Sequence, residues 1–245
     1  MCFTIAIHQT RTEIEIRYNK KFDSNAENFE PRYYISAFEF PKVTVISEER
    51  SDKIELMHWG LIPSWLKDID KANEFRLNTL NAKSETLLEK PSFRQSVSNR
   101  RCLIIINGFF EWQHVGKEKI PHFIHLKNEK LFSLGGLYDE WANGKTGEIY
   151  TGFSILTCEA NPLLAKIHNT KKRMPIIISK SDEEIWIDKK QDFSSVSKLL
   201  KPQDENNIEA WPINDLINDR NANKNIPDLL NKRVSSQSNN QLNLF

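Results

Sequence analysis

The chain has 245 residues, of which 39% are hydrophobic and 27% are charged, and its formal net charge is +1. This length can bury a sizeable core, and we expect one domain. No apolar run approaches the roughly 20 residues of a membrane span, and charged residues from Arg11 onward interrupt any signal-peptide pattern, so we predict a soluble, cytoplasmic protein. The small net charge excludes nucleic-acid binding by bulk charge and leaves only a local basic patch.

The three cysteines, Cys2, Cys102 and Cys158, are too few and too scattered for a disulfide framework or a zinc site. Cys102 precedes an apolar run and Cys158 follows one, which predicts two buried structural thiols. Cys2 differs, because removal of the initiator methionine leaves a residue with both a thiol and an α-amine. Their reference pKa values, about 8.5 and about 7.7–8.0, give both groups a nucleophilic fraction near neutral pH. An aldehyde could form an imine with the amine, and the thiol could then close a thiazolidine ring; an ordinary small residue at the terminus is the alternative.

The first third of the chain predicts a series of strands. Apolar and β-branched runs cover residues 3–8, 32–38, 42–47 and 53–59, whereas residues 13–16 fit a strand or a helix. In the segment Trp59–Trp65, Gly60 and Pro63 oppose regular structure, which predicts a loop with two indoles. These tryptophans either anchor the core or form an aromatic wedge that stacks on nucleobases.

The continuous apolar run at residues 101–106 predicts a central buried strand. Directly after it, Glu111 lies among three aromatic residues, where desolvation would raise its pKa and make it a proton carrier near neutrality. A solvated strand residue is the alternative for Glu111. Further strands are predicted at residues 121–126, 131–138 and 149–158, with a bulge or a close backbone approach at Gly135-Gly136.

Short helices are predicted around these strands. One begins at residues 91–94, one runs from the N-cap Asn161 to His168, one starts with a capping box at Ser181, and one covers residues 193–200. His168 is followed by three cations and is either a helix-end residue or a functional one. The Ser, Asn and Gln content from Val234 onward predicts a disordered tail. The sequence has no phosphate loop, dinucleotide glycine fingerprint or His-Glu-x-x-His motif, and it predicts no cofactor.

Taken together, these segments resemble the SOS response-associated peptidase (SRAP) family, whose members crosslink themselves to abasic sites in single-stranded DNA. The match runs from Cys2 to roughly Pro212. In order, its segments are Cys2, Trp59–Trp65, Asn81–Glu85, Arg101–Leu103, Asn107–Trp112, Gly136–Tyr138, Ile167-His168 and Arg173–Pro175. Several spaced motifs in one order are more specific than any one of them.

The resemblance implies an α+β fold, a single domain at residues 1–233 around a barrel-like, mainly antiparallel sheet with short flanking helices. It also implies that Cys2 is the nucleophile, that Asn81 holds the deoxyribose and the N-terminal residue, that Glu111 shuttles protons, and that His168 assists opening of the sugar ring. The implied activity is abasic-site crosslinking, with a thiol (auto)peptidase or lyase-like character and without a metal or cofactor. We expect a monomer that acts at the nucleoid.

The expected DNA contacts combine aromatic and basic side chains, namely Trp59, Pro63, Trp65, Lys83, Arg94, Arg100 and Arg101. The sequence departs from the family pattern in two places. Phe3-Thr4 replaces the usual Gly-Arg, which removes a cation near the DNA backbone, and Lys83 replaces a common arginine, which keeps the charge without bidentate geometry.

The last five residues resemble the pentapeptide that binds the bacterial sliding clamp, with Gln241, Leu242, Leu244 and Phe245 as the expected contacts. Two other functions stay open. An N-terminal-nucleophile glutamine amidotransferase would use the same cysteine, although we find no arginine pocket or synthase domain for it. A non-covalent single-stranded DNA binding module would need the tryptophans and not Cys2.

Overall fold

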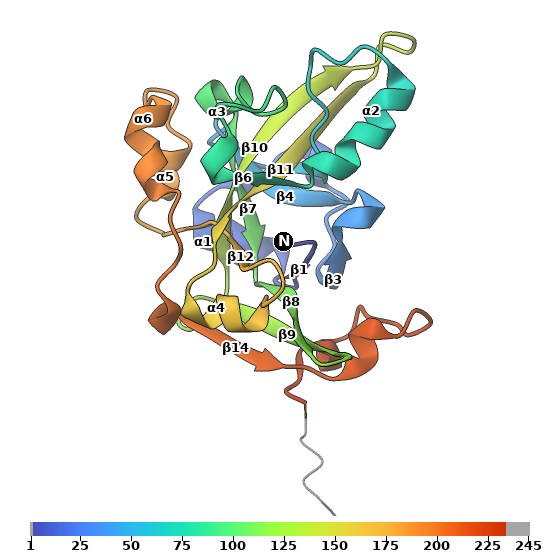
Figure 1. Ribbon diagram of the computed structural model, residues 1–245. Helices are drawn as coiled ribbons and strands as arrows, with labels where there is room; N and C mark the ends of the chain where they lie inside the picture. The colour runs from blue at the N-terminus through green and yellow to red at the C-terminus, as the bar shows by residue number, and fades with distance from the viewer. Residues whose placement is uncertain (1, 234–245) are drawn as a thin grey trace, which may run out of the picture.

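The computed structural model describes residues 2–233 (Figure 1). The expected tail and its clamp motif therefore lie outside the described residues. Two sheets form the body of the molecule. The first is a barrel-like sheet with the order β14 (Ile208–Pro212), β9 (Glu118–Leu126), β8 (Gly108–Val115), β1 (Thr4–Ile7) and β3 (Arg32–Ser36).

The second sheet is larger and contains most of the remaining strands. Its order is β12 (Arg173–Pro175), β11 (Ile149–Glu159), β10 (Phe132–Ala142), β7 (Arg101–Ile106), β4 (Lys42–Ser47), β5 (Lys53–Trp59) and β2 (Lys21–Phe22). Two short strands join it from the side, β13 (Ile177–Ile178) on β10 and β6 (Asn81–Lys83) on β11. Most pairs are antiparallel, and β11 also pairs in parallel with β5 and β6. The α+β class and the mainly antiparallel sheet are thus confirmed.

Short helices flank the sheets. They are α1 (Arg11–Tyr18), α2 (Ile69–Phe75), α3 (Ser96–Asn99), α4 (Pro162–Ile167), α5 (Glu183–Trp186) and α6 (Phe193–Val196), with several single 3₁₀ turns between elements. None of the helices within residues 2–233 has the length and apolar content to cross a membrane.

The predicted central strand is confirmed, since all six residues of β7 are buried. It pairs antiparallel with β10 on one side and β4 on the other. Gly136 lies at a close approach, because a Cβ there would be 3.0 Å from Cys102 Sγ, and the pairing of β10 continues through it without a bulge. Cys102 and Cys158 are both buried, as expected of structural thiols.

The helix predictions were partly right. Residues 13–16 belong to α1, where Thr10 and Glu13 form a capping box and Ile14 turns inward. Asn161 caps α4 as expected, with its Oδ1 accepting from the backbone N of Leu164 at 2.8 Å. Two predictions were wrong: α3 begins at Ser96 after a series of turns, and α5 has Asp182 as its N-cap without a side-chain hydrogen bond. Local capping patterns do not include the tertiary contacts that decide between a turn and a helix.

Candidate active site

Residues far apart in the sequence meet at the start of β1, near the centre of the molecule (Figure 1). Cys2 lies two residues before the first residue of β1, and β1 pairs antiparallel with β8, with Ile5 opposite Phe109. This register places the residues before β1 beside Glu111. Asn81 at the start of β6 donates from Nδ2 to the carbonyl oxygen of Cys2 at 2.9 Å. The structure therefore brings together Cys2, Asn81 and Glu111.

His168 completes this group at the C-cap of α4. Its Nδ1 lies 3.8 Å from Glu111 Oε1 and 2.8 Å from the carbonyl oxygen of Arg173. A carbonyl only accepts, so Nδ1 carries the proton and Nε2 is the basic ring nitrogen. Burial lowers the pKa of His168, which favours the neutral imidazole at neutral pH.

The Cys2 thiol is buried. Its exposed fraction is 0%. Burial raises the pKa of the Cys2 thiol, and the nearby carboxylate of Glu111 raises it further. The thiol is therefore protonated at neutral pH and needs a base to become a thiolate. The sequence could not show this, because the burial of Cys2 depends on strands far away in the chain.

Glu111 is the base that lies beside this thiol. Only 4% of its surface is exposed, and burial raises its pKa to about 7. The expected rise in pKa is confirmed, since burial removes water from the carboxylate. A carboxyl group with a pKa near neutrality can both donate and accept a proton under physiological conditions.

Four of the seven residues expected at the DNA are accessible. Lys83 follows Asn81 at the exposed end of β6, and Arg94 is also exposed. Trp65 has an exposed fraction of 44% and packs edge-on against Phe75. The side chain of Arg100 is 34% exposed and pairs with Asp139. Solvent therefore reaches these four side chains.

Trp59 and Pro63 are corrections to the expected DNA surface, because both are buried. Trp59 stacks on Phe153 at 6.0 Å, and its Nε1 donates to the carbonyl oxygen of Leu80 at 2.8 Å. It therefore anchors the core next to Asn81 and offers no face to a nucleobase. A loop with two indoles does not reveal from sequence which one turns inward.

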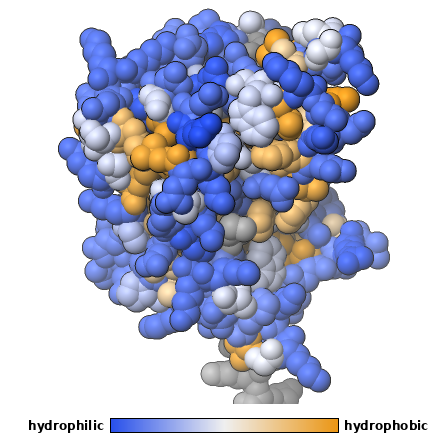
Figure 2. Space-filling view, turned by 45° about the horizontal axis from the view of Figure 1, so that its top comes forward, coloured by the Kyte–Doolittle hydropathy of each residue, from blue (hydrophilic) through white to orange (hydrophobic). Residues whose placement is uncertain are grey.

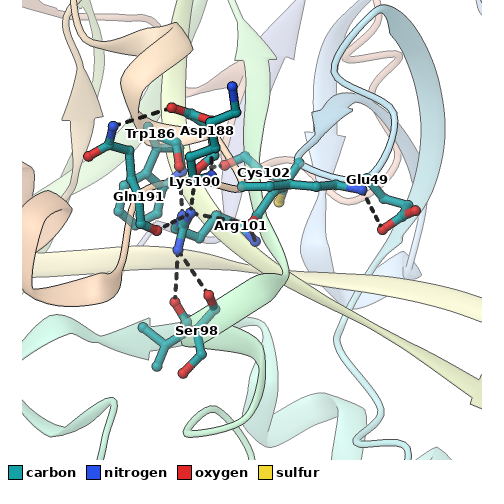
Figure 3. Close-up of polar contacts among 11 residues, drawn as sticks. Glu49, Ser98, Arg101, Cys102, Trp186, Asp188, Lys190 and Gln191 are labelled. Carbon is teal, nitrogen blue, oxygen red and sulfur yellow. Dashed lines mark hydrogen bonds and ion pairs between the residues drawn. The ribbon is translucent and has the colours of Figure 1, made fainter.

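Arg101 is the third correction, since its side chain has no exposed surface (Figure 3). Its guanidinium donates to the backbone carbonyls of Trp186 at 2.8 Å and Asp188 at 2.9 Å, and it pairs with Glu48 at 3.3 Å. Further carbonyl contacts go to Val97, Ser98 and Gln191. Arg101 thus joins β7 to the segment around α5 and cannot reach a phosphate.

Arg173 is a site residue that reasoning from single residues missed. Besides presenting its carbonyl to His168, it makes a bidentate pair with Glu85 at 2.7 and 2.9 Å, and its guanidinium also donates to the carbonyl oxygen of Thr157 at 2.7 Å. These contacts fix the backbone that orients the histidine. Within residues 2–233, no cluster of three or more His, Cys, Asp or Glu could hold a metal ion.

Several known proteins are similar to this chain. The family model for SOS response associated peptidase (SRAP) matches residues 1–220. The chain belongs to this family. The abasic site processing protein YoqW of Bacillus subtilis is 35% identical over 190 residues, which are 77% of this chain and 80% of that protein. The abasic site processing protein HMCES of Rattus norvegicus is 33% identical over 215 residues, covering 74% of this chain and 58% of that protein.

A solved crystal structure supports the fold. An X-ray crystal structure of a protein from Bacteroides thetaiotaomicron superposes with a TM-score of 0.89 at 35% identity, and the alignment covers 95% of this chain and 100% of that one. The arrangement of strands in this SRAP chain is therefore one that a crystal structure also shows.

Phe3 and Thr4, at the start of this SRAP chain, have different surroundings. Phe3 packs against Phe38 with a centroid distance of 5.1 Å, and 59% of Phe38 is exposed. Thr4 is buried, with an exposed fraction of 5%. Nearby, the guanidinium of Arg76 lies 3.8 Å from the centroid of Phe40. An aromatic residue therefore follows Cys2 directly and packs on a second one, Phe38.

Proposed function

We propose that this chain captures abasic sites in single-stranded DNA as a covalent thiazolidine through Cys2. The observation that supports this most strongly is the position of Cys2, whose carbonyl is held by Asn81 and whose thiol lies beside a carboxyl group with a pKa of about 7. The names of the relatives point to the same lesion, since YoqW and HMCES are abasic site processing proteins.

The reaction requires that Cys2 becomes the first residue, because only then is its nitrogen an amine. The amine adds to the aldehyde of the open sugar, and loss of one water gives an imine. The thiol sulfur then adds to the imine carbon, and the nitrogen takes up the proton that the thiol gives up. The net product is a five-membered ring that joins Cys2 to the former aldehyde carbon, with one water released.

In this proposal, Glu111 moves the protons of these steps. As a carboxylate it can take the thiol proton, and as an acid it can protonate the hydroxyl that leaves as water. His168, neutral and with Nδ1 fixed by Arg173, presents Nε2 as a base for opening the closed sugar to its aldehyde. Asn81 holds the backbone of Cys2 so that amine and thiol approach the same carbon.

The accessible side chains around the site are suited to hold the strand. Lys83 and Arg94 can contact phosphates, while Trp65 and Phe38 can stack on bases that flank the lesion. The face shown in Figure 2 is mostly hydrophilic, with apolar side chains gathered in separate patches. Such a mixture fits a single strand, whose backbone is charged and whose bases are flat and apolar.

We propose that this chain removes its own Met1, which would be its peptidase activity. The alternative is that a separate aminopeptidase removes Met1. Alanine at position 2 is small enough for an aminopeptidase to remove the methionine in front of it. Intact mass of the Cys2→Ala variant therefore separates the two agents, since loss of Met1 in this variant shows an aminopeptidase and its retention shows self-cleavage.

We further propose that the C-terminal segment binds the sliding clamp, which would bring the protein to stalled forks at the nucleoid. The support is the sequence alone, since residues 234–245 are outside the described part. A peptide of residues 235–245 should bind purified clamp with a dissociation constant of about 1 μM, typical of a short segment that orders on binding. Deletion of residues 244–245 should abolish this binding and leave crosslinking of a free oligonucleotide unchanged; equal binding by both peptides would refute the motif.

The proposed capture is tested with an oligonucleotide whose uracil has been removed by uracil glycosylase. A denaturing gel should show a shifted protein–DNA band, and a variant with an N-terminal tag that blocks Met1 removal should show none. A native shift without a denaturant-resistant band would instead indicate non-covalent binding. Hydrolysis of glutamine without any adduct would indicate the amidotransferase.

A further inference from the structure

Arg76 is a half-buried arginine whose charge has no acidic partner within residues 2–233. Every other arginine that is buried or half-buried in this range contacts a carboxylate or a backbone carbonyl oxygen; these are Arg11, Arg17, Arg32, Arg50, Arg100, Arg101 and Arg173. The Nε of Arg76 is also buried and has no hydrogen-bond partner. A partly desolvated cation without a counter-ion destabilises the folded chain unless a ligand supplies the anion.

Aromatic rings hold the guanidinium of Arg76 in place. It lies 3.8 Å from the centroid of Phe40, so that one face of its plane is covered. Tyr150 is a second neighbour, because burial raises the pKa of its phenol and the Arg76 guanidinium lowers this pKa in part. The hydroxyl of Tyr150 donates to the carbonyl oxygen of Gly60 at 2.8 Å, so the phenol is neutral and adds no negative charge. The two Nη groups of this stacked side chain therefore form a fixed fork, which matches the oxygens of a phosphate.

The position of Arg76 in the chain brings it close to the proposed site. Arg76 begins η3 (Arg76–Thr79), the 3₁₀ turn between α2 and β6, and Asn81 is the first residue of β6 (Figure 1). At a rise of about 2 Å per residue, the chain from Arg76 to Asn81 spans on the order of 10 Å. Stacked nucleotides follow one another at about 3.4 Å, so this span corresponds to about three nucleotides.

Exposed aromatic rings lie in the same two segments as Arg76 and Phe40. Trp65, of which 44% is exposed, packs edge-on against Phe75, the residue before Arg76. Phe38, of which 59% is exposed, lies two residues before Phe40. A cation among exposed rings suits a single strand, in which phosphates alternate with flat bases.

We propose that Arg76 binds a backbone phosphate within about three nucleotides of the lesion and thereby helps to position the strand over Cys2. This inference rests on the proposed capture of abasic DNA and adds a residue to its binding surface. Arg76 and Lys83 lie on either side of Asn81 in the sequence, so two cations flank the residue that holds the carbonyl of Cys2.

The test measures binding of the full-length protein to a single strand that carries tetrahydrofuran at the lesion position. Tetrahydrofuran has no aldehyde, so fluorescence anisotropy reports binding without capture. Arg76→Gln should weaken binding about tenfold and lower the slope of log K against log salt concentration by about 0.7. Arg76→Lys keeps the charge and loses the planar fork, so it should keep the slope and bind with an intermediate affinity. Arg220→Gln removes the same charge from an exposed arginine without an ion pair in residues 2–233, and it should change neither value.

A scan with methylphosphonates, which are neutral, identifies the phosphate that Arg76 contacts. One such replacement within about three nucleotides of the lesion should weaken binding of the wild type about tenfold and have little further effect on Arg76→Gln. An unchanged salt slope for Arg76→Gln, or equal effects of every methylphosphonate on the two proteins, would overturn the proposal, whatever the Tm of the variant. Arg76-dependent binding by a wild type that forms no denaturant-resistant adduct with a true abasic strand would instead refute the capture at Cys2 and support the role of Arg76.

Discussion

Replacing Glu111 with glutamine tests the raised pKa of this carboxyl group through protein stability. The rise from 4.5 to about 7 corresponds to about 3 kcal/mol of free energy. Between these two pH values the folded protein binds the Glu111 proton more tightly than the unfolded chain does. The contribution of this proton to stability is therefore fully present below about pH 4.5 and is lost as the pH rises through 7.

Glutamine does not titrate, so Glu111→Gln removes this pH dependence. The free energy of unfolding of the variant, relative to the wild type, should rise by up to about 3 kcal/mol between pH 4.5 and pH 8.5. Urea unfolding of both proteins at the two pH values measures the difference. Glu140→Gln, at an exposed position of β10, is the control and should show no such rise.

The same substitution should slow adduct formation by about 10²–10⁴-fold while leaving DNA binding nearly unchanged. The rate of the wild type should also change with an apparent pKa near 7, and the variant should lose this inflection. If the stability difference is the same at both pH values, the carboxyl group is not desolvated as described. Equal rates in the two proteins would remove Glu111 from the mechanism.

The remaining predictions concern neighbouring residues with contrasting roles. Asn81→Ala should slow crosslinking more than it weakens DNA binding, because the carbonyl of Cys2 loses its donor; an equal loss of both would show a role in binding alone. Arg101→Ala should lower the free energy of unfolding by about 3–5 kcal/mol in urea with an unchanged crosslinking rate, whereas Arg94→Ala should weaken DNA binding without lowering stability. Trp65→Ala should weaken single-stranded DNA binding about tenfold by fluorescence titration, and unchanged affinity would remove Trp65 from the interface.

The strands could be predicted because their signal is local. The apolar run that forms β7 and the β-branched runs before Trp59 indicate buried strands by their composition alone. The helix cap at Asn161 was equally local, since it needs only the next three residues. That Asn81 and His168 belong to the same site as Cys2 could be predicted only from the family resemblance. Neither residue has a local sequence pattern that indicates that it lies near Cys2.

What the sequence could not show is which of two similar neighbours turns inward. Arg100 and Arg101 are adjacent cations, yet one reaches solvent and the other is enclosed by backbone carbonyls. Trp59 and Trp65 differ in the same way. These choices depend on long-range packing, which short sequence patterns do not encode.

The central claim is that Cys2 closes a ring on the abasic aldehyde, and intact mass of the denatured adduct tests it most directly. Wild-type protein should give the mass of residues 2–245 plus the oligonucleotide minus one water, stable to heat without reductant. Cys2→Ala should give no such species, because alanine keeps the amine but forms only a hydrolysable imine, which borohydride should still trap. A heat-stable adduct of Cys2→Ala in the same yield as wild type, without reductant, would contradict the thiazolidine mechanism.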